Sequence, residues 1–159
     1  MSALLALALA LAAQADGRQL IGVFERWGAF RDAAPRRCYA IAQPLARRDA
    51  AAWPAFASVA AWPGQGIRHQ LHLRLSRTRA ASARVTLSIG ERRFELVAGA
   101  ADAWSPDTAT DAAIVAAMRG GRSMSVETLG ADGAPFADTY RLSGAATAID
   151  AAAVACARR

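Results

Sequence analysis

The feature that most constrains the fold of this chain is a regular alternation of apolar and polar residues between Ile67 and Ala98. The alternation occupies three segments, 67–76, 84–89 and 93–98, separated by short connections. Successive side chains of a β-strand point to opposite faces, so each segment would present one apolar and one largely polar face. The stretch therefore predicts a half-buried antiparallel sheet, with a core on one side and water on the other.

Further strands are expected on both sides of this stretch. Their predicted ranges are 20–30, 38–42, 56–62, 122–129 and 136–142. Gly90-Glu91 suits a two-residue type II′ hairpin turn, which prefers glycine at its first position. Because strands and helices do not alternate as βαβ units, we predict a mainly β chain: an antiparallel β-sandwich or rolled sheet of about seven strands with two short helices.

The two helices are expected in the C-terminal part of the chain. The first has Thr110 as its N-cap and Asp111 in its first turn, and it closes at Arg119 and Gly120. The second begins at a capping-box pattern formed by Thr147 and Asp150. Its apolar stripe is expected to be Ile149, Ala153 and Cys156, at helical spacing.

The N-terminus has the pattern of an export signal. Residues Ser2 to Ala13 form an uncharged apolar run that is shorter than the ~20 residues needed to span a bilayer. The small-x-small triplet ending at Ala15 follows, as at a signal-peptidase site. We therefore expect residues 1–15 to be a signal peptide and residues 16–159 to form one domain. The alternative is a buried N-terminal helix.

The two cysteines agree with an oxidising compartment. Cys38 and Cys156 are an even count in a chain that we expect to be exported, which predicts one disulfide joining the start of the domain to its end. The alternative is a pair of buried free thiols. Neither cysteine belongs to a CxxC motif, which disfavours redox catalysis and zinc binding.

Basic residues give the chain a formal net charge of +6, and every one of them is arginine. Arginine-only usage is typical of GC-rich coding, but guanidinium groups also hold phosphate and carboxylate bidentately. On neighbouring strands, one polar face would collect a positive patch with anion-binding character. Its members are Arg68, His72, Arg74, Arg84 and Arg93. Lipid phosphates or acidic glycans would suit this patch. Nucleic acid is not expected, because the chain has no nucleic-acid-binding motif. The alternative is a solvated polar face.

Catalytic and metal-binding patterns are weak. His69 and His72 are three apart, so on a strand they point to opposite faces and do not share one metal ion. The chain has no GxSxG nucleophile motif and no glycine-rich nucleotide-binding loop. Asp138 shares a strand face with apolar residues, which favours an arginine or backbone partner over acid–base chemistry. We therefore predict no catalytic residue, no metal site and no cofactor.

The four tryptophans allow two interpretations. They are Trp27, Trp53, Trp62 and Trp104. Such residues form sugar-binding platforms in some proteins, but core packing and the anchoring of loops are commoner uses. We expect Trp27 to lie in the core.

Several segments resemble one family. In the C-terminal half these are DAAIVAAMRGG, RSMSVETL, GADG, FADTYRLSG and AATAIDAAAVACA; earlier in the chain they are RWGAF and RCYAIAQP. Together they resemble the invasion-associated locus B family of alphaproteobacterial exported proteins, over roughly Trp27 to Cys156. The resemblance implies a secreted or periplasmic β-rich domain linked to the cell envelope or to host-cell invasion. It supplies no catalytic residues.

These observations predict a non-catalytic envelope or host-interaction protein, periplasmic or secreted, without a transmembrane span. Its partner is expected to be an anionic envelope component or another envelope or host protein. One alternative is an extracytoplasmic hydrolase that uses His72 with a serine and an aspartate. Another is a periplasmic inhibitor of an envelope hydrolase, which the positive charge disfavours when the target is basic.

Overall fold

The computed structural model describes residues 17–46, 51 and 53–157. Ten strands and two α-helices are present in these ranges. The strands are β1 (Arg18–Phe24), β2 (Trp27–Asp32), β3 (Arg37–Ala42), β4 (Phe56–Trp62), β5 (Ile67–Arg74), β6 (Val85–Ile89), β7 (Arg92–Ala98), β8 (Asp102–Trp104), β9 (Ser123–Leu129) and β10 (Pro135–Arg141). The helices are α1 (Thr108–Gly120) and α2 (Ala145–Ala157), and a short 3₁₀ turn, Pro63–Gln65, joins β4 to β5.

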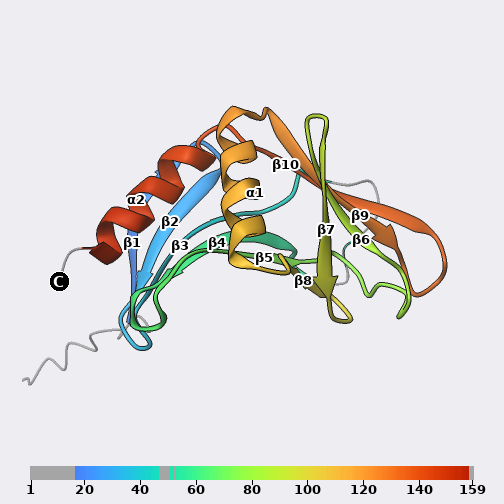
Figure 1. Cartoon of the computed structure of the whole chain (residues 1–159), viewed down its shortest axis with the longest axis horizontal. Helices are drawn as coiled ribbons and strands as arrows, with labels where there is room; N and C mark the ends of the chain where they lie inside the picture. The colour runs from blue at the N-terminus through green and yellow to red at the C-terminus, as the bar shows by residue number, and fades with distance from the viewer. Residues whose placement is uncertain (1–16, 47–50, 52, 158–159) are drawn as a thin grey trace, which may run out of the picture.

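All ten strands belong to one curled antiparallel sheet with the order β1-β2-β3-β4-β5-β8-β7-β6-β9-β10. Both helices lie on the same side of this sheet (Figure 1). Helix α2 packs across β1 to β4, and α1 packs over β5. The buried apolar side chains of the strands form one cluster with those of both helices, so the core lies between the sheet and the helix layer. We call the helix-covered face the inner face and the opposite one the outer face.

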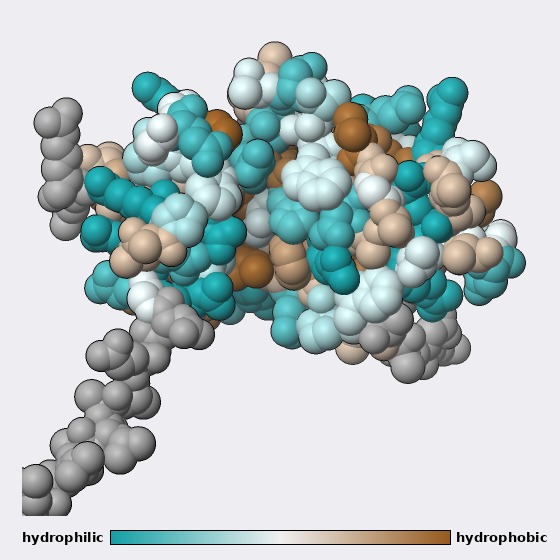
Figure 2. All heavy atoms as spheres, turned by 90° about the horizontal axis from the view of Figure 1, so that it is seen from below, coloured by the Kyte–Doolittle hydropathy of each residue, from teal (hydrophilic) through white to brown (hydrophobic). Residues whose placement is uncertain are grey.

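The outer face carries the polar half of the alternating pattern. Seen from below in Figure 2, it is mainly hydrophilic or weakly polar, with apolar patches between. On β5, Leu71 and Leu73 are buried on the inner face, while Arg68, His72 and Arg74 alternate with the inward residues. The predicted half-buried antiparallel sheet is therefore confirmed, as are the opposite orientations of His69 and His72.

The mainly β class and the rolled sheet are confirmed, whereas the β-sandwich and the strand count of about seven are wrong. The range 20–30 holds two strands, β1 and β2, with the turn between them at Glu25 and Arg26. The sequence contains no glycine or asparagine at this turn that would have predicted it. Glu25 itself takes a left-handed conformation, with φ of 55°. Strand β8 lies outside all of the predicted strand ranges.

The helix boundaries also differ from the predicted ones. The N-cap of α1 is Asp107, whose side chain accepts a hydrogen bond from the Thr110 amide at 2.7 Å, so Thr110 is not the cap. The helix continues through Gly120. Helix α2 begins at Ala145, before the expected capping box. Asp150 instead forms an ion pair with Arg119 of α1 at 2.6 Å.

Two contacts fix the start of α2 against the β1–β2 hairpin. Gly144, immediately before the helix, has φ of 85°, and a Cβ there would lie 2.1 Å from the Phe24 carbonyl oxygen. Only glycine allows this approach. Trp27, fully buried as predicted, donates its indole N–H to the Arg141 carbonyl at the end of β10, at 2.8 Å. The hairpin therefore supports the chain where it passes from β10 into α2.

The predicted disulfide is present. Cys38 on β3 and Cys156 in the last turn of α2 are bonded across 118 residues of sequence. Both residues are buried. Arg36 donates a hydrogen bond to the Cys156 carbonyl at 2.8 Å, so a cation also satisfies the C-terminal end of the helix. The bond thus clamps the alanine-rich α2 onto the sheet that it covers.

Replacing Cys156 with Ser should lower the melting temperature of the oxidised protein by roughly 10 °C. Closing a loop of this length is worth about 4–5 kcal/mol in the chain-entropy model, and each kcal/mol moves the midpoint by about 2–4 °C in a domain of this size. Differential scanning calorimetry with and without reductant measures the shift. Equal melting temperatures for variant and wild type without reductant would contradict the clamp.

Candidate functional site on the outer face

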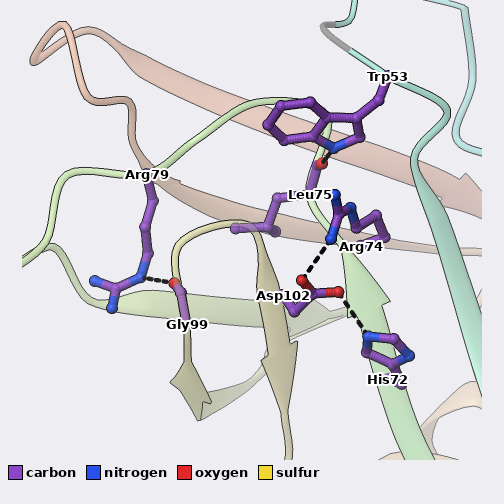
Figure 3. A network of polar contacts seen from close by, with 7 residues as sticks. All are labelled: Trp53, His72, Arg74, Leu75, Arg79, Gly99 and Asp102. Atoms are coloured by element: carbon purple, nitrogen blue, oxygen red, sulfur yellow. Dashed lines mark hydrogen bonds and ion pairs between the residues drawn. The ribbon is translucent and has the colours of Figure 1, made fainter.

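The most connected group of polar side chains on the outer face surrounds Asp102, the first residue of β8. Its two carboxylate oxygens bond to two side chains of β5: His72 Nε2 at 2.8 Å and Arg74 Nη1 at 2.7 Å (Figure 3). Strand β8 pairs with β5 through His72↔Trp104 and Arg74↔Asp102, which places all four residues together. The carboxylate therefore joins β8 to β5 through side chains as well as through the backbone.

Aromatic rings surround this polar group. The His72 imidazole stacks on the Trp104 indole with centroids 5.2 Å apart, and it meets the edge of Phe56 at 5.1 Å. The Arg74 guanidinium lies 5.0 Å from the centre of the Trp53 ring. These contacts hold His72 and Arg74 in fixed positions, as cation–π and aromatic stacking generally do. The result is a surface on which charged and aromatic groups are in mutual contact.

The tryptophans mostly act as anchors. Trp53 donates its indole N–H to the Leu75 carbonyl at 2.6 Å, and Trp62 donates to the Gln70 side chain at 3.0 Å. Trp104 is 37 % exposed and sits directly opposite Val97 of β7, which is 58 % exposed. Of the four, Trp104 is the one that offers exposed aromatic surface to a partner.

Arg79 holds the connections beside this site. Its guanidinium donates to the Gly99 carbonyl at 2.7 Å (Figure 3). It also donates to the Ala98 carbonyl at 2.9 Å. The same group bonds to the carbonyls of residues 80, 81 and 83. Through these bonds one side chain fixes both the loop after β5 and the β7–β8 turn. Sequence reasoning did not single out Arg79, since nothing local distinguishes it from the other arginines.

The five predicted anion-binding residues do not form one patch of free cations. His72 and Arg74 already share Asp102, while Arg84 lies 3.7 Å from Glu95 in an exposed ion pair. The remaining two residues, Arg93 and Arg68, differ from each other. Arg93 donates to Ser88 Oγ at 2.7 Å, whereas exposed Arg68 has no ion-pair partner within the described ranges. Anion binding by these residues stays a prediction.

Their separation follows from the strand order. The predicted patch assumed that β5 is adjacent to the strands at 84–89 and 93–98, but β8 lies between β5 and β7. This inserted strand brings in Asp102 and Trp104, which sequence reasoning missed as members of the site. Three residues are too few for a period-2 pattern, so the sequence carried no signal for β8.

A second arginine–aromatic group lies near the other end of the outer face. The Arg37 guanidinium lies 4.4 Å from the centre of the Tyr39 ring and 5.0 Å from that of Trp62. Arg37 and Arg18 both bond to Asp32, at 2.6 and 3.2 Å. Burial acts to raise the pKa of Asp32, but the hydrogen bonds from Arg37 and Arg18 outweigh it and hold this pKa below its ordinary value.

Buried carboxylates in this protein bond to backbone amides. Asp138 is fully buried and accepts a hydrogen bond from the Ser76 amide at 2.8 Å, so of the two expected kinds of partner, arginine or backbone, a backbone partner is present. Asp111 accepts from the Leu71 amide at 2.9 Å and from the Ser105 hydroxyl. These bonds attach the end of β5 to β10 and α1 to β5. Both carboxylates therefore have structural roles.

The fold and the outer face define a class: a small curled antiparallel sheet, backed by two helices and closed by a disulfide, with arginine and aromatic side chains on its open face. The chain is similar in structure to invasion associated protein B from Bartonella henselae, with a TM-score of 0.65 and 17 % sequence identity. The match covers 89 % of this chain and 99 % of that protein. No family model matches the chain, and no curated protein matches it. The family resemblance that the sequence suggested is thus supported at the level of the fold.

Replacing Asp102 with Ala should destabilise the protein by about 1–3 kcal/mol, because His72 and Arg74 each lose a charged partner at the junction of β5 and β8. The matched control is Asp150→Ala, which removes a solvent-exposed ion pair and should cost less than about 1 kcal/mol. Urea unfolding measures both. Equal losses for the two variants would show that Asp102 is an ordinary surface residue.

The stability of the protein should fall as the pH decreases through about 6.5, because of His69. Burial first, and then the positive charge of Arg119, lower the pKa of His69 below 6.5, although Asp111 and Asp150 act in the opposite direction. The unfolded chain therefore binds this proton at a higher pH than the folded chain does, and protonation favours unfolding.

Replacing His69 with Gln should remove this part of the pH dependence. The pKa values of Asp32 and Asp150 are lowered from 3.8, so their contributions are lost only at more acidic pH. Urea unfolding at pH 7.5 and pH 5 separates the two effects. If wild type and His69→Gln lose the same free energy of unfolding over this interval, the assignment to His69 is wrong.

Proposed function

We propose that this chain is a non-catalytic exported protein, periplasmic or secreted, that acts by binding at the cell envelope or at a host surface. The similarity in fold to invasion associated protein B, over 89 % of the chain, carries this proposal. The name of that protein links it to invasion. For this chain, a role in invasion belongs to the proposal.

Two features of the chain support export. The apolar run from Ser2 to Ala13 and the small-x-small triplet ending at Ala15 have the pattern of a cleavable signal. A disulfide between Cys38 and Cys156 is the kind of bond that persists in oxidising compartments. Within the described residues, no helix has the length and apolar character needed to cross a bilayer.

The outer face supports a role in binding. It presents Trp104 and Val97 as exposed apolar groups beside charged side chains whose positions are fixed by internal bonds. Rigid aromatic and arginine side chains are the groups that contribute most to protein interfaces. The proposed partner is an anionic envelope component or another envelope or host protein.

A hydrolase receives no support from the geometry of His72. Its Nε2 is bonded to Asp102, and Ser58 lies opposite it on β4. Nucleophilic catalysis requires a serine within hydrogen-bond reach of the imidazole. Among the described residues, no serine donates a hydrogen bond to His72. No observation favours the inhibitor alternative either.

Protein recovered from the periplasm or the medium should begin at Asp16, because the expected cleavage follows Ala15. Edman sequencing of the recovered chain tests this, and cytosolic material that retains Met1 would contradict export.

The exported protein, immobilised in its oxidised form, serves as bait for envelope extracts. We expect capture of the partner to be lost when Trp104 and Val97 are both replaced by Ser, and to be kept after Leu129→Ser. This result would place the partner on the outer face. If the double variant captures as much partner as the wild type does, that placement is wrong.

A further inference from the structure

A cavity of about 570 Å³ lies between the C-terminal half of α2 and the β4–β5 end of the sheet, where Arg68 and His69 of β5 both line it. In Figure 1 this region is where the free end of α2 passes above the β4–β5 connection. Helix α1 packs over β5, and α2 packs over β1 to β4. The cavity lies where the C-terminal end of α2 passes the first residues of β5. Its volume is within the range of pockets that hold small molecules.

The cavity exists because the residues around it are small. Ala61 of β4 and Ala153 and Ala157 of α2 line it, together with Ile67. A methyl group fills far less of the space between a helix and a sheet than a leucine or isoleucine side chain would. The disulfide at Cys156 holds this end of α2 to β3. The helix is therefore held in place by a covalent bond while the volume beside it stays unfilled by side chains.

Two polar residues also line this otherwise apolar cavity, and neither has a hydrogen-bond or ion-pair partner among the described residues. The His69 imidazole, partly buried, makes no hydrogen bond to any residue in the described part of the chain. Arg68 is exposed and has no ion-pair partner there either. The nearby carboxylates are already engaged: Asp150 pairs with Arg119, and Asp111 accepts from the Leu71 amide. The cavity therefore combines apolar walls with an uncompensated positive charge and a free imidazole.

We infer that this cavity binds a single-chain anionic amphiphile, with its apolar chain against Ala61, Ala153 and Ala157 and its carboxylate or phosphate head at Arg68 and His69. A guanidinium group recognises either head by charge and by hydrogen bonds. Alanine walls recognise only an apolar body. The inference stands on the cavity and its two unpartnered residues, and it holds whether or not the protein is exported.

Titration calorimetry with decanoate, decyl phosphate, decanol and inorganic phosphate tests the site on the oxidised full domain, residues 16–159. Decanoate or decyl phosphate should bind saturably at one site, and the two compounds show which head is preferred. Inorganic phosphate alone should not bind measurably. Ala153→Leu should weaken amphiphile binding by roughly tenfold or more, because the new side chain occupies the chain-binding volume. Ala116→Leu, an exposed substitution of the same kind on α1, is the control and should leave binding unchanged.

Arg68→Gln provides a second variant that does not alter the walls of the cavity. It should weaken decanoate binding by roughly fivefold or more while changing decanol binding by less than about twofold. Loss of the head-group preference in this variant would support the assigned orientation. The inference is overturned if neither anionic amphiphile binds saturably to the wild type, or if both Ala153→Leu and Arg68→Gln bind them as the wild type does.

Discussion

The two halves of the sheet depend on one short connection, the strand β8. Between the strands β1–β5 and the strands β6, β7, β9 and β10, the ladder runs through β8, which pairs with β7 by only Val97↔Trp104 and Ala98↔Ala103. So short a ladder contributes little by itself. Side chains add bonds across the junction, Asp102 to β5 and Arg79 to the β7–β8 turn, and backbone hydrogen bonds from residues 75–80 join them. Asp138 adds a bond from β10 to the Ser76 amide.

This constraint also explains the character of the outer face. An arginine that bonds to carbonyls, as Arg79 does, or to a shared carboxylate, as Arg74 does, has little capacity left for an external anion. Much of the positive charge near the junction is therefore structural. Arg68 differs because it lies at the far end of β5, away from the junction and next to the 3₁₀ turn. A high arginine content by itself thus does not point to a binding site, whereas Arg68, which has no ion-pair partner among the described residues, belongs to the site that we propose.

The sequence predicted the parts of the fold that follow from local patterns. Alternation on β5, β6 and β7 identified these strands and the face that each one buries, and Gly90-Glu91 marked a two-residue turn that the pairing Ile89↔Arg92 confirms. The sequence also predicted that Trp27 is buried, that Asp138 has an arginine or backbone partner, and that the two cysteines form a disulfide. The failures share one physical cause. Strand β8, the Glu25 turn and the start of α2 are determined by contacts with distant residues, such as that of Gly144 with Phe24, which a local pattern does not contain.

The composition of α2 links the disulfide to the cavity. An alanine-rich helix removes little apolar area per residue from water, so its packing alone gives a weak attachment to the sheet. Larger side chains would strengthen the attachment, but they would also fill the space beside β5. A covalent bond at Cys156 provides the attachment without filling that space. Three features distinguish this region from an ordinary helix–sheet interface, whose stability comes from close packing: small side chains, a clamped helix, and an imidazole at His69 without a hydrogen-bond partner in the described part of the chain.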